Sequence, residues 1–332
     1  MSGEGVTCMQ CGATVVAADR FCEKCGTILS GVRRVAIPMP VQSLPGPCTD
    51  CGNDTYADEY CTVCGQRRAG PDRDHTTLDG IVLITDRGLE HTRNEDAAAA
   101  GIVTGGAMAI AICDGVSASA EAHTAAVSAS IAGVEGMLRA LTASSRPPSA
   151  VLAGLTDAAM AAASAGLGST DPNMAPSCTY AAAVVVPTPD GVEITVGNVG
   201  DSRVYWLPEP PAAAQCLTVD DSLAQELISA GIAADSEAVQ AGAHTLTRWL
   251  GADAEPTPWS DSSVWSITTA EPGLLLLCTD GLWNYLPDAD DIARICAGDD
   301  ADAAARALVD YALSAGGHDN VTVAVIPIGG PS

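Results

Sequence analysis

Residues 274–286 read "LLLLCTDGLWNYL", an unbroken apolar run that stops on the carboxylate of Asp280. A run of this length and composition predicts a strand that is buried on both faces. Residues 107–119, "AMAIAICDGVSAS", repeat the pattern and stop on Asp114. An aspartate after one strand is an ordinary turn residue. Two such strands raise the question of what the two acids share.

The rest of the large C-terminal part alternates short strands with separate groups of helices. A Pro-Asp-Gly turn at 189–191, between two β-branched runs, predicts a hairpin. This pattern favours an α+β fold with antiparallel sheets over a doubly wound parallel sheet. Strands are expected at about 80–85, 97–103, 107–113, 179–186, 192–197, 203–207, 244–250, 263–267, 273–278 and 321–326, and helices at 119–142, 149–165, 222–230, 288–297 and 301–314.

The chain has 332 residues and a formal net charge of −26, with nearly all the excess acid after residue 75. This length fits one large domain together with a small additional domain or segment. The charge opposes attraction to nucleic acid or an anionic membrane, and favours cationic partners, metal ions or solubility. The N-terminus has no secretion signal, and no apolar stretch approaches the ~18 residues of a spanning helix. We expect a soluble, cytoplasmic protein without a membrane partner.

Eight of the thirteen cysteines lie before residue 65, in two sets that each read CxxC, a gap of about ten residues, and CxxC. Four thiolates at this spacing predict a tetrahedral zinc site, so we expect two zinc ribbons with two structural Zn²⁺ ions. A thioredoxin-like CxxC would need a βαβ unit, for which there is no room. Because the ribbons have few large apolar residues, zinc binding should also supply most of their folding free energy. The ligands are Cys8, Cys11, Cys22 and Cys25 in the first set, and Cys48, Cys51, Cys61 and Cys64 in the second.

These patterns divide the chain into five segments. Residues 31–47 contain four prolines and no helical period, which is typical of a linker. The expected order is zinc ribbon 1 at 1–30, a linker at 31–47, zinc ribbon 2 at 48–66, a second linker at 67–77, and the large domain at 78–328.

Acids recur at the borders of apolar strands throughout the large domain. Any one of them could cap a turn, but a set of aspartates at strand ends could hold two hard divalent cations through oxygen ligands. Such a pair of cations supports phosphoester hydrolysis. The acids are Glu95 and Asp96 in "NEDA", Asp114 in "CDG", Asp201 in "GDSR", Asp280 in "TDG" and Asp319 in "HDN".

Seven segments, in order, resemble the type 2C family of metal-dependent serine/threonine protein phosphatases. The resemblance spans residues 78 to 328 and implies a β-sandwich of two antiparallel sheets flanked by helices. The segments are "DRGLEHTRNEDA" (86–97), "AICDGVSAS" (111–119), "VGNVGDSRVYWL" (196–207), "LTVDDSLAQELISAGIA" (217–233), "LTRWLGAD" (246–253), "LLLLCTDGLW" (274–283) and "GGHDNVTVAVI" (316–326).

The resemblance implies two Mn²⁺ or Mg²⁺ ions bridged by Asp114, with the Gly115 carbonyl on one ion and Asp280 and Asp319 on the other. A third, weaker ion would involve Asp201 together with Asp280. Glu95 and Asp96 match acids that reach the metals largely through water, and Asn320 would orient Asp319. A hydroxide that bridges the metals then attacks phosphorus in phosphoserine or phosphothreonine. Phosphorylated proteins are the implied substrates.

Three features depart from the family pattern; one is Asp220 and Asp221, which stand where relatives often have Asp-His, and the other two bear on catalysis. Relatives often carry an arginine where this chain has His91, so the substrate phosphate is expected to bind His91, Arg93 or both. Val116 stands where some relatives have a histidine that acts as general acid, so His91 or a metal-bound water would replace it. The expected catalytic set is therefore Asp114, Asp280, Asp319, His91 and Arg93.

Two alternatives remain beside an active phosphatase. The domain could be a noncatalytic module that binds or recruits phosphoproteins, although every expected metal-site acid is present. The ribbons could bind nucleic acid, but aromatic stacking residues are scarce in them. Docking of a protein partner, or regulation, is the preferred role for the ribbons.

Overall fold

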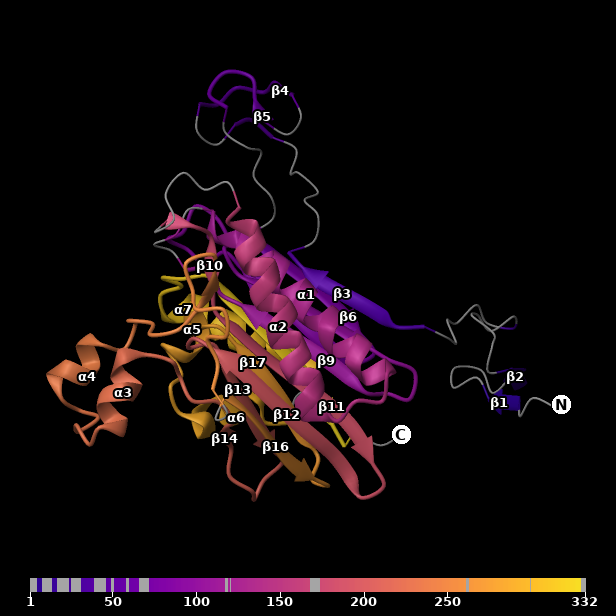
Figure 1. Ribbon diagram of the computed structural model, residues 1–332. Helices are drawn as coiled ribbons and strands as arrows, with labels where there is room; N and C mark the ends of the chain where they lie inside the picture. The colour runs from indigo at the N-terminus through magenta and orange to yellow at the C-terminus, as the bar shows by residue number, and fades with distance from the viewer. Residues whose placement is uncertain are drawn as a thin grey trace.

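The computed structural model describes residues 31–38, 46–48, 51–57, 60–65, 72–116, 119, 121–167, 174–260, 263–298 and 300–329, with residue 24 and two short strands near the N-terminus. Two six-stranded antiparallel sheets form its centre, with helices along their outer faces (Figure 1). This architecture confirms an α+β fold of two antiparallel sheets.

The first sheet has the order β16-β12-β11-β9-β8-β3 and the second has the order β14-β13-β17-β18-β7-β6. The strands of the first sheet are β3 (Arg33–Ile37), β8 (Ala97–Ile102), β9 (Met108–Cys113), β11 (Tyr180–Thr188), β12 (Gly191–Val199) and β16 (Val264–Thr269). Those of the second are β6 (Arg73–Leu78), β7 (Ile81–Asp86), β13 (Arg203–Pro208), β14 (Gln215–Cys216), β17 (Gly273–Cys278) and β18 (Val321–Ile328). The expected hairpin joins β11 to β12.

Three two-stranded pairs and seven helices complete the described elements. The pairs are β1 (Gly5–Thr7) with β2 (Thr14–Val16), β4 (Tyr56–Ala57) with β5 (Tyr60–Cys61), and β10 (Ser177–Cys178) with β15 (Leu250–Gly251). The helices are α1 (Ala122–Thr142), α2 (Pro147–Ala165), α3 (Leu223–Ser229), α4 (Glu237–Ala241), α5 (Asp280–Trp283), α6 (Ala289–Cys296) and α7 (Ala301–Ala315).

The leucine run of β17 lies in the interior of this layered structure. Leu275 and Leu277 pack between the two sheets, whereas Leu276 and Cys278 point into the layer that α6 and α7 cover. Because both faces of the strand meet apolar side chains, its sequence shows no polar alternation. On the other side of the sandwich, α1 and α2 cover the first sheet.

Both stretches expected to be linkers contain strands. Residues 33–37 form β3, which pairs with β8, and residues 73–78 form β6, which pairs with β7. The four prolines of 31–47 all follow Ile37, so the composition of the whole window obscured a strand at its start. Ile37 is 1% exposed and packs in the core between the sheets.

The strand expected at 244–250 is wrong, since only Leu250 of these residues is in a strand.

Among the described residues, no helix is long and apolar enough to cross a membrane.

Candidate active site

All the expected acids of the large domain lie at one end of the sandwich, because of how the strands pair. In the first sheet β9 ends at Cys113 opposite Ala97, so Asp114 emerges beside Asp96. In the second, β17 ends at Cys278 opposite Val323, so Asp280 emerges beside the turn that carries Asp319. The two sheets are joined here by Thr279 Oγ1, which donates a hydrogen bond to Asp96 Oδ2 over 2.9 Å.

Asp96 is the most deeply buried of these acids, at 1% exposed. Burial raises the pKa of its carboxyl to about 8; hydrogen bonds from Thr322 and Thr279 oppose this shift, and the charges of Asp319 and Asp280 add to it. Its Oδ1 has no hydrogen-bond partner in the part of the chain that the structure describes. A buried polar atom of this kind is costly unless a ligand satisfies it.

Asp280 is the first residue of α5, a short helix that the sequence did not predict. Its Oδ2 accepts a hydrogen bond from Asn284 Nδ2 at 3.2 Å, while Oδ1 is buried and has no partner among the described residues. Burial and the charge of Asp319 raise the pKa of Asp280, against hydrogen bonding with Asp114. The chain can turn here only because residue 281 is glycine: a Cβ there would lie 1.9 Å from the Asn320 carbonyl oxygen.

Asp114 and Asp201 complete the acidic centre. Burial, and then the charges of Asp96, Asp280, Asp201 and Asp319, raise the pKa of Asp114 well above its ordinary range. Burial and the charges of Asp280 and Asp220 raise the pKa of Asp201 to about 8. Gly115, whose carbonyl is a candidate ligand, is buried and bridges to Cys178.

Asn320 fixes the loop between β7 and β8, which carries the candidate phosphate-binding side chains. Its Oδ1 accepts from the Glu95 amide at 2.7 Å, and its Nδ2 donates to the carbonyls of Arg87 and Arg93 at 2.7 and 3.1 Å. Its own amide donates to Asp319 Oδ1 at 2.8 Å. One amide side chain thus ties this loop to Asp319.

His91, Arg93 and Glu95 lie on that loop. His91 Nε2 lies 3.2 Å from Asp319 Oδ1, so it borders the acidic centre, whereas the Arg93 side chain is exposed. Burial raises the pKa of Glu95, against the charges of Arg93 and His91. The sequence left open whether His91, Arg93 or both serve the site, and the structure places His91 Nε2 within 3.2 Å of Asp319.

His244 is a neighbour of the acids that the sequence analysis missed. Its Nδ1 lies 3.9 Å from Asp280 Oδ2, and its ring stacks on Trp283 with 6.2 Å between centroids. The Arg203 guanidinium also lies over Trp283, 3.8 Å from the ring centroid. Trp283 is buried and its Nε1 donates to the Asp201 carbonyl at 2.9 Å, so it is a packing residue. No spacing signal linked His244 to Asp280, because only the fold brings them together.

The acidic centre suits divalent cations. Several carboxylates converge with raised pKa values, and two of their buried oxygens lack a partner among the described residues, so bound cations would relieve both the repulsion and the desolvation. Oxygen ligands are those that Mn²⁺ and Mg²⁺ take. The residues that would hold them are Glu95, Asp96, Asp114, Gly115, Asp201, Asp280 and Asp319.

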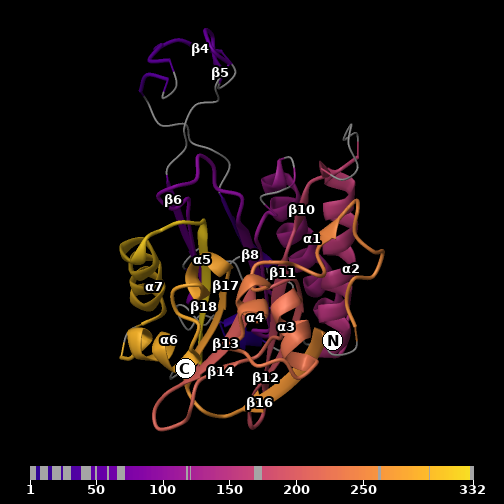
Figure 2. The same ribbon diagram turned by 90° about the vertical axis from the view of Figure 1, so that its left-hand side faces the viewer.

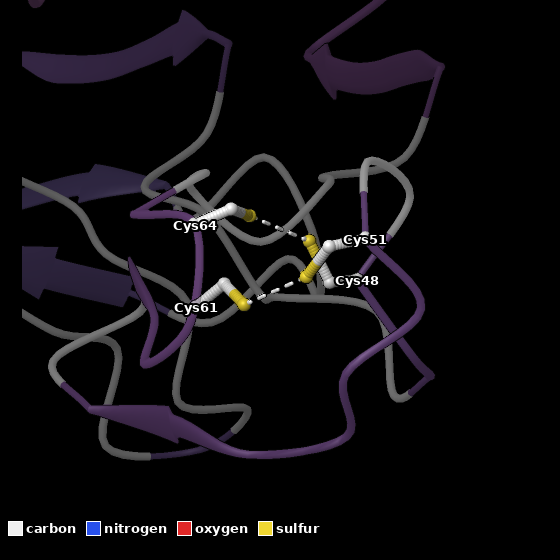
Figure 3. A group of neighbouring side chains, drawn as sticks. All are labelled: Cys48, Cys51, Cys61 and Cys64. Carbon is white, nitrogen blue, oxygen red and sulfur yellow. Dashed lines mark hydrogen bonds between the residues drawn. The ribbon is translucent and has the colours of Figure 1, made fainter.

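The second cysteine set forms a separate cluster. The sulfurs of Cys48, Cys51, Cys61 and Cys64 all lie within 4.8 Å of one another, closer than any group of three or more acids or histidines in the described residues (Figure 3). A hydrogen bond from the Cys64 backbone lowers the pKa of Cys61 to about 6, against burial. Four converging thiols suit one zinc ion. The first set, at Cys8, Cys11, Cys22 and Cys25, lies outside the described residues.

The structure is thus an α+β sandwich of two antiparallel sheets, covered by helices, with carboxylates gathered at one end. Residues 87–298 match the family model for Protein phosphatase 2C. Since that match covers more than half of the chain, the protein belongs to the protein phosphatase 2C family.

Relatives agree with this assignment. The serine/threonine phosphatase stp of Listeria innocua is 32% identical over 135 residues, which are 40% of this chain and 51% of that protein. The serine/threonine protein phosphatase PstP of Mycobacterium tuberculosis is 29% identical over 252 residues, 74% of this chain and 44% of that protein. The chain therefore spans about half the length of these relatives.

Solved structures share the fold. The phosphatase MsPP of Mycobacterium smegmatis, in complex with cacodylate, is 29% identical with a TM-score of 0.59, covering 76% of this chain and 99% of that chain. The catalytic domain of PstP in complex with two manganese ions is 23% identical with a TM-score of 0.52, covering 75% of this chain and 97% of that chain.

Proposed function

We propose that the protein hydrolyses phosphoserine and phosphothreonine in proteins with the help of divalent cations. The observation that carries this proposal is the convergence of carboxylates from both sheets at one end of the sandwich, with Asp96 Oδ1 and Asp280 Oδ1 buried and unpartnered among the described residues. Membership of the protein phosphatase 2C family supports it.

The cations are two Mn²⁺ or Mg²⁺, with a third, weaker one at Asp201 and Asp280. Asp114, Asp280 and Asp319 would hold the pair, with the Gly115 carbonyl, Glu95 and Asp96 as further ligands. When bound, such cations supply a water of lowered pKa as nucleophile and offset charge on the phosphoryl oxygens. Two manganese ions in the PstP catalytic domain are consistent with this number.

The protein's own side chains orient the substrate phosphate. His91 lies against Asp319 and can donate a hydrogen bond to a phosphoryl oxygen, and the exposed Arg93 on the same loop can pair with the phosphate charge. Asn320 holds both in place through the loop carbonyls and the Glu95 amide. The Asp319 carboxylate, a candidate cation ligand, and the His91 imidazole, a hydrogen-bond donor, thus lie side by side.

Hydrolysis of a phosphoserine peptide and of p-nitrophenyl phosphate with added Mn²⁺ tests this proposal. Turnover is expected, and Asp280→Ala or Asp319→Ala should abolish it. Peptide binding without turnover by manganese-loaded protein would instead support a noncatalytic phosphoprotein-binding module.

We further propose that Cys48, Cys51, Cys61 and Cys64 hold a structural zinc ion, and that the first cysteine set holds a second one in a ribbon at 1–30. The spacing of the sulfurs in the second set supports the first of these sites. We assign the zinc modules to protein docking or regulation rather than to nucleic acid, because acid predominates in the chain. Metal analysis of the purified chain should give two zinc ions, and a single one would exclude the ribbon at 1–30.

A further inference from the structure

The second cysteine cluster lies in the sequence between two edge strands, β3 and β6. Strand β3 ends, and strand β6 begins, at the end of the sandwich that carries the acids. Strand β3 ends at Ile37, which pairs with Ala98, two residues after Asp96. Strand β6 begins at Arg73, which pairs with Asp86 just before the loop that carries His91. The chain therefore leaves the sandwich and returns to it beside the acidic centre.

Short connections keep the cluster near this end. Residues 39–47 and 66–72 can span at most about 30 and 25 Å when fully extended. Figures 1 and 2 both show β4 and β5, which belong to the cysteine module at 48–65, beyond the end of the sandwich where β6 begins.

The return point of the module is bonded to the candidate phosphate-binding loop. The Arg87 amide donates to the Asp72 carbonyl at 2.8 Å, and Arg87 Nε donates to the Asp72 carboxylate at 2.9 Å. The same guanidinium donates to the His91 carbonyl. The Arg87 carbonyl accepts a hydrogen bond from Asn320 Nδ2 at 2.7 Å. Asp72 is thus part of the support of the loop.

The module offers a surface suited to a polypeptide. Tyr60 and Val63 are 52% and 71% exposed although both are large and apolar. Residues 48–66 contain four acidic side chains and no basic one, and four thiolates on a zinc ion would add further negative charge. Apolar contacts combined with negative charge fit a polypeptide that carries basic residues.

We propose that the cysteine module at 48–65 is a substrate-binding element at the mouth of the active site. It contacts the polypeptide on one side of the phosphorylated residue and favours basic residues there. This inference rests on the proposed phosphatase function and deepens it by naming the substrate class.

The test compares two triple variants of the full chain. One, Asp54→Asn, Asp58→Asn and Glu59→Gln, removes three of the four acidic charges of the module. The matched control removes the same charge from exposed loops at the opposite end of the sandwich, through Asp190→Asn, Glu209→Gln and Glu271→Gln. Zinc content and thermal stability are checked first, so that loss of the module's fold is recognised.

Two fluorescent phosphoserine peptides serve as probes, one flanked by three arginines and one by three glutamates. Kd is measured by anisotropy without added cation, so that the peptide is not turned over. KM and kcat are measured with manganese and compared with those for p-nitrophenyl phosphate in the same variant. We expect the module variant to bind the arginine peptide roughly fivefold to tenfold more weakly, as three exposed charge pairs allow, and the control to change by less than twofold.

Equal weakening in both variants, or none in the module variant, would overturn the inference. Wild-type protein that hydrolyses p-nitrophenyl phosphate but binds both peptides equally would also overturn it while leaving the phosphatase intact. A protein that lacks turnover yet binds the arginine peptide through the module would overturn the phosphatase and retain the docking surface.

Discussion

Asp96 and Asp280 each keep one buried carboxylate oxygen without a partner among the described residues. Other acids are among their neighbours, and the pKa values of Asp96, Asp114, Asp201 and Asp280 are all raised, by burial first. At these positions the metal-free protein carries an unfavourable concentration of negative charge. Such a cost at a site points to a ligand that removes it.

Replacing Asp280 with asparagine should separate fold from function. The amide keeps the shape of the side chain and removes one of several repelling charges, so we expect the metal-free protein to gain about 1 kcal/mol in unfolding free energy. Turnover should fall at least about a hundredfold through lost cation affinity. Manganese titration followed by calorimetry, with kinetics, measures both effects. Asp190→Asn, far from the acids, is the control, and an active Asp280→Asn protein would contradict the assignment.

Proton release should accompany cation binding. The pKa of Asp96 and of Asp201 is about 8 in the folded protein, against about 4 for an unfolded aspartate. Between these values the folded metal-free state holds more protons than the unfolded state, so its stability falls as pH rises from about 4 to 8. Cations need the ionised carboxylates, so manganese binding at pH 7 should release protons.

Calorimetry in buffers of different ionisation enthalpy measures that proton release. Thermal unfolding of metal-free protein at pH 5, 6, 7 and 8 measures the stability trend. An unfolding temperature that rises over this pH range, or binding without proton release, would show that these acids are already ionised without metal.

Gly281→Ala should be strongly destabilising. The added Cβ would lie 1.9 Å from the Asn320 carbonyl oxygen, so either α5 or the turn at Asn320 must move. We expect a loss of about 3 kcal/mol or more in urea unfolding. Gly281 does not have a positive φ, so this cost comes from the contact, whereas at Gly298 a Cβ meets nothing within 4 Å and φ is +81°, so Gly298→Ala measures a purely conformational cost for comparison. A Gly281→Ala loss of less than about 1 kcal/mol would argue against the close contact.

At the scale of elements, the edge strands β3 and β6 extend the sandwich beyond the boundary at residue 78 that the sequence favoured. Each completes a six-stranded sheet, and Ile37 of β3 contributes to the core between the sheets. Arg33 and Arg34 add ion pairs to Asp79 and Glu135. The structural unit that carries the acidic centre therefore includes β3, and the cysteine module lies between two of its strands in the sequence.

Ile37→Ala should consequently destabilise the catalytic sandwich. Ile37 is 1% exposed, and removing its buried methyl groups should cost about 2–4 kcal/mol in denaturant unfolding. Val63→Ala, on the exposed surface of the module, should cost less than about 0.5 kcal/mol. If Ile37→Ala were as mild as this control, β3 would be dispensable and the boundary at residue 78 would stand.

At the scale of the whole molecule, the cysteine module has its own source of stability. The three hydrophobic clusters of the sandwich include Ile37 but neither Cys48 nor Cys61. Zinc is thus expected to order the module without holding the two sheets together.

A Cys48→Ser, Cys61→Ser variant tests this independence. It should lose one zinc ion per chain while the main thermal transition moves by no more than about 2 °C, because the sandwich core is untouched. Metal analysis and differential scanning calorimetry measure the two quantities. Collapse of the main transition together with zinc loss would show that the module is part of the sandwich core.

The sequence by itself determined the local features of this protein. Apolar runs that end on acids predicted the buried strands β9 and β17 and singled out Asp114 and Asp280, and regular cysteine spacing predicted the cluster that the structure contains. These features were readable because each depends on residues that are close in the chain.

Only the tertiary structure decided what lies next to the acids. The ties from Asn320 to the loop at 87–95, the approach of His244 to Asp280, and the pairing of β3 and β6 as edge strands all join residues far apart in sequence. Strand pairing and side-chain contacts at such separations follow from the packing of the whole sandwich, and no local pattern in the chain encodes them.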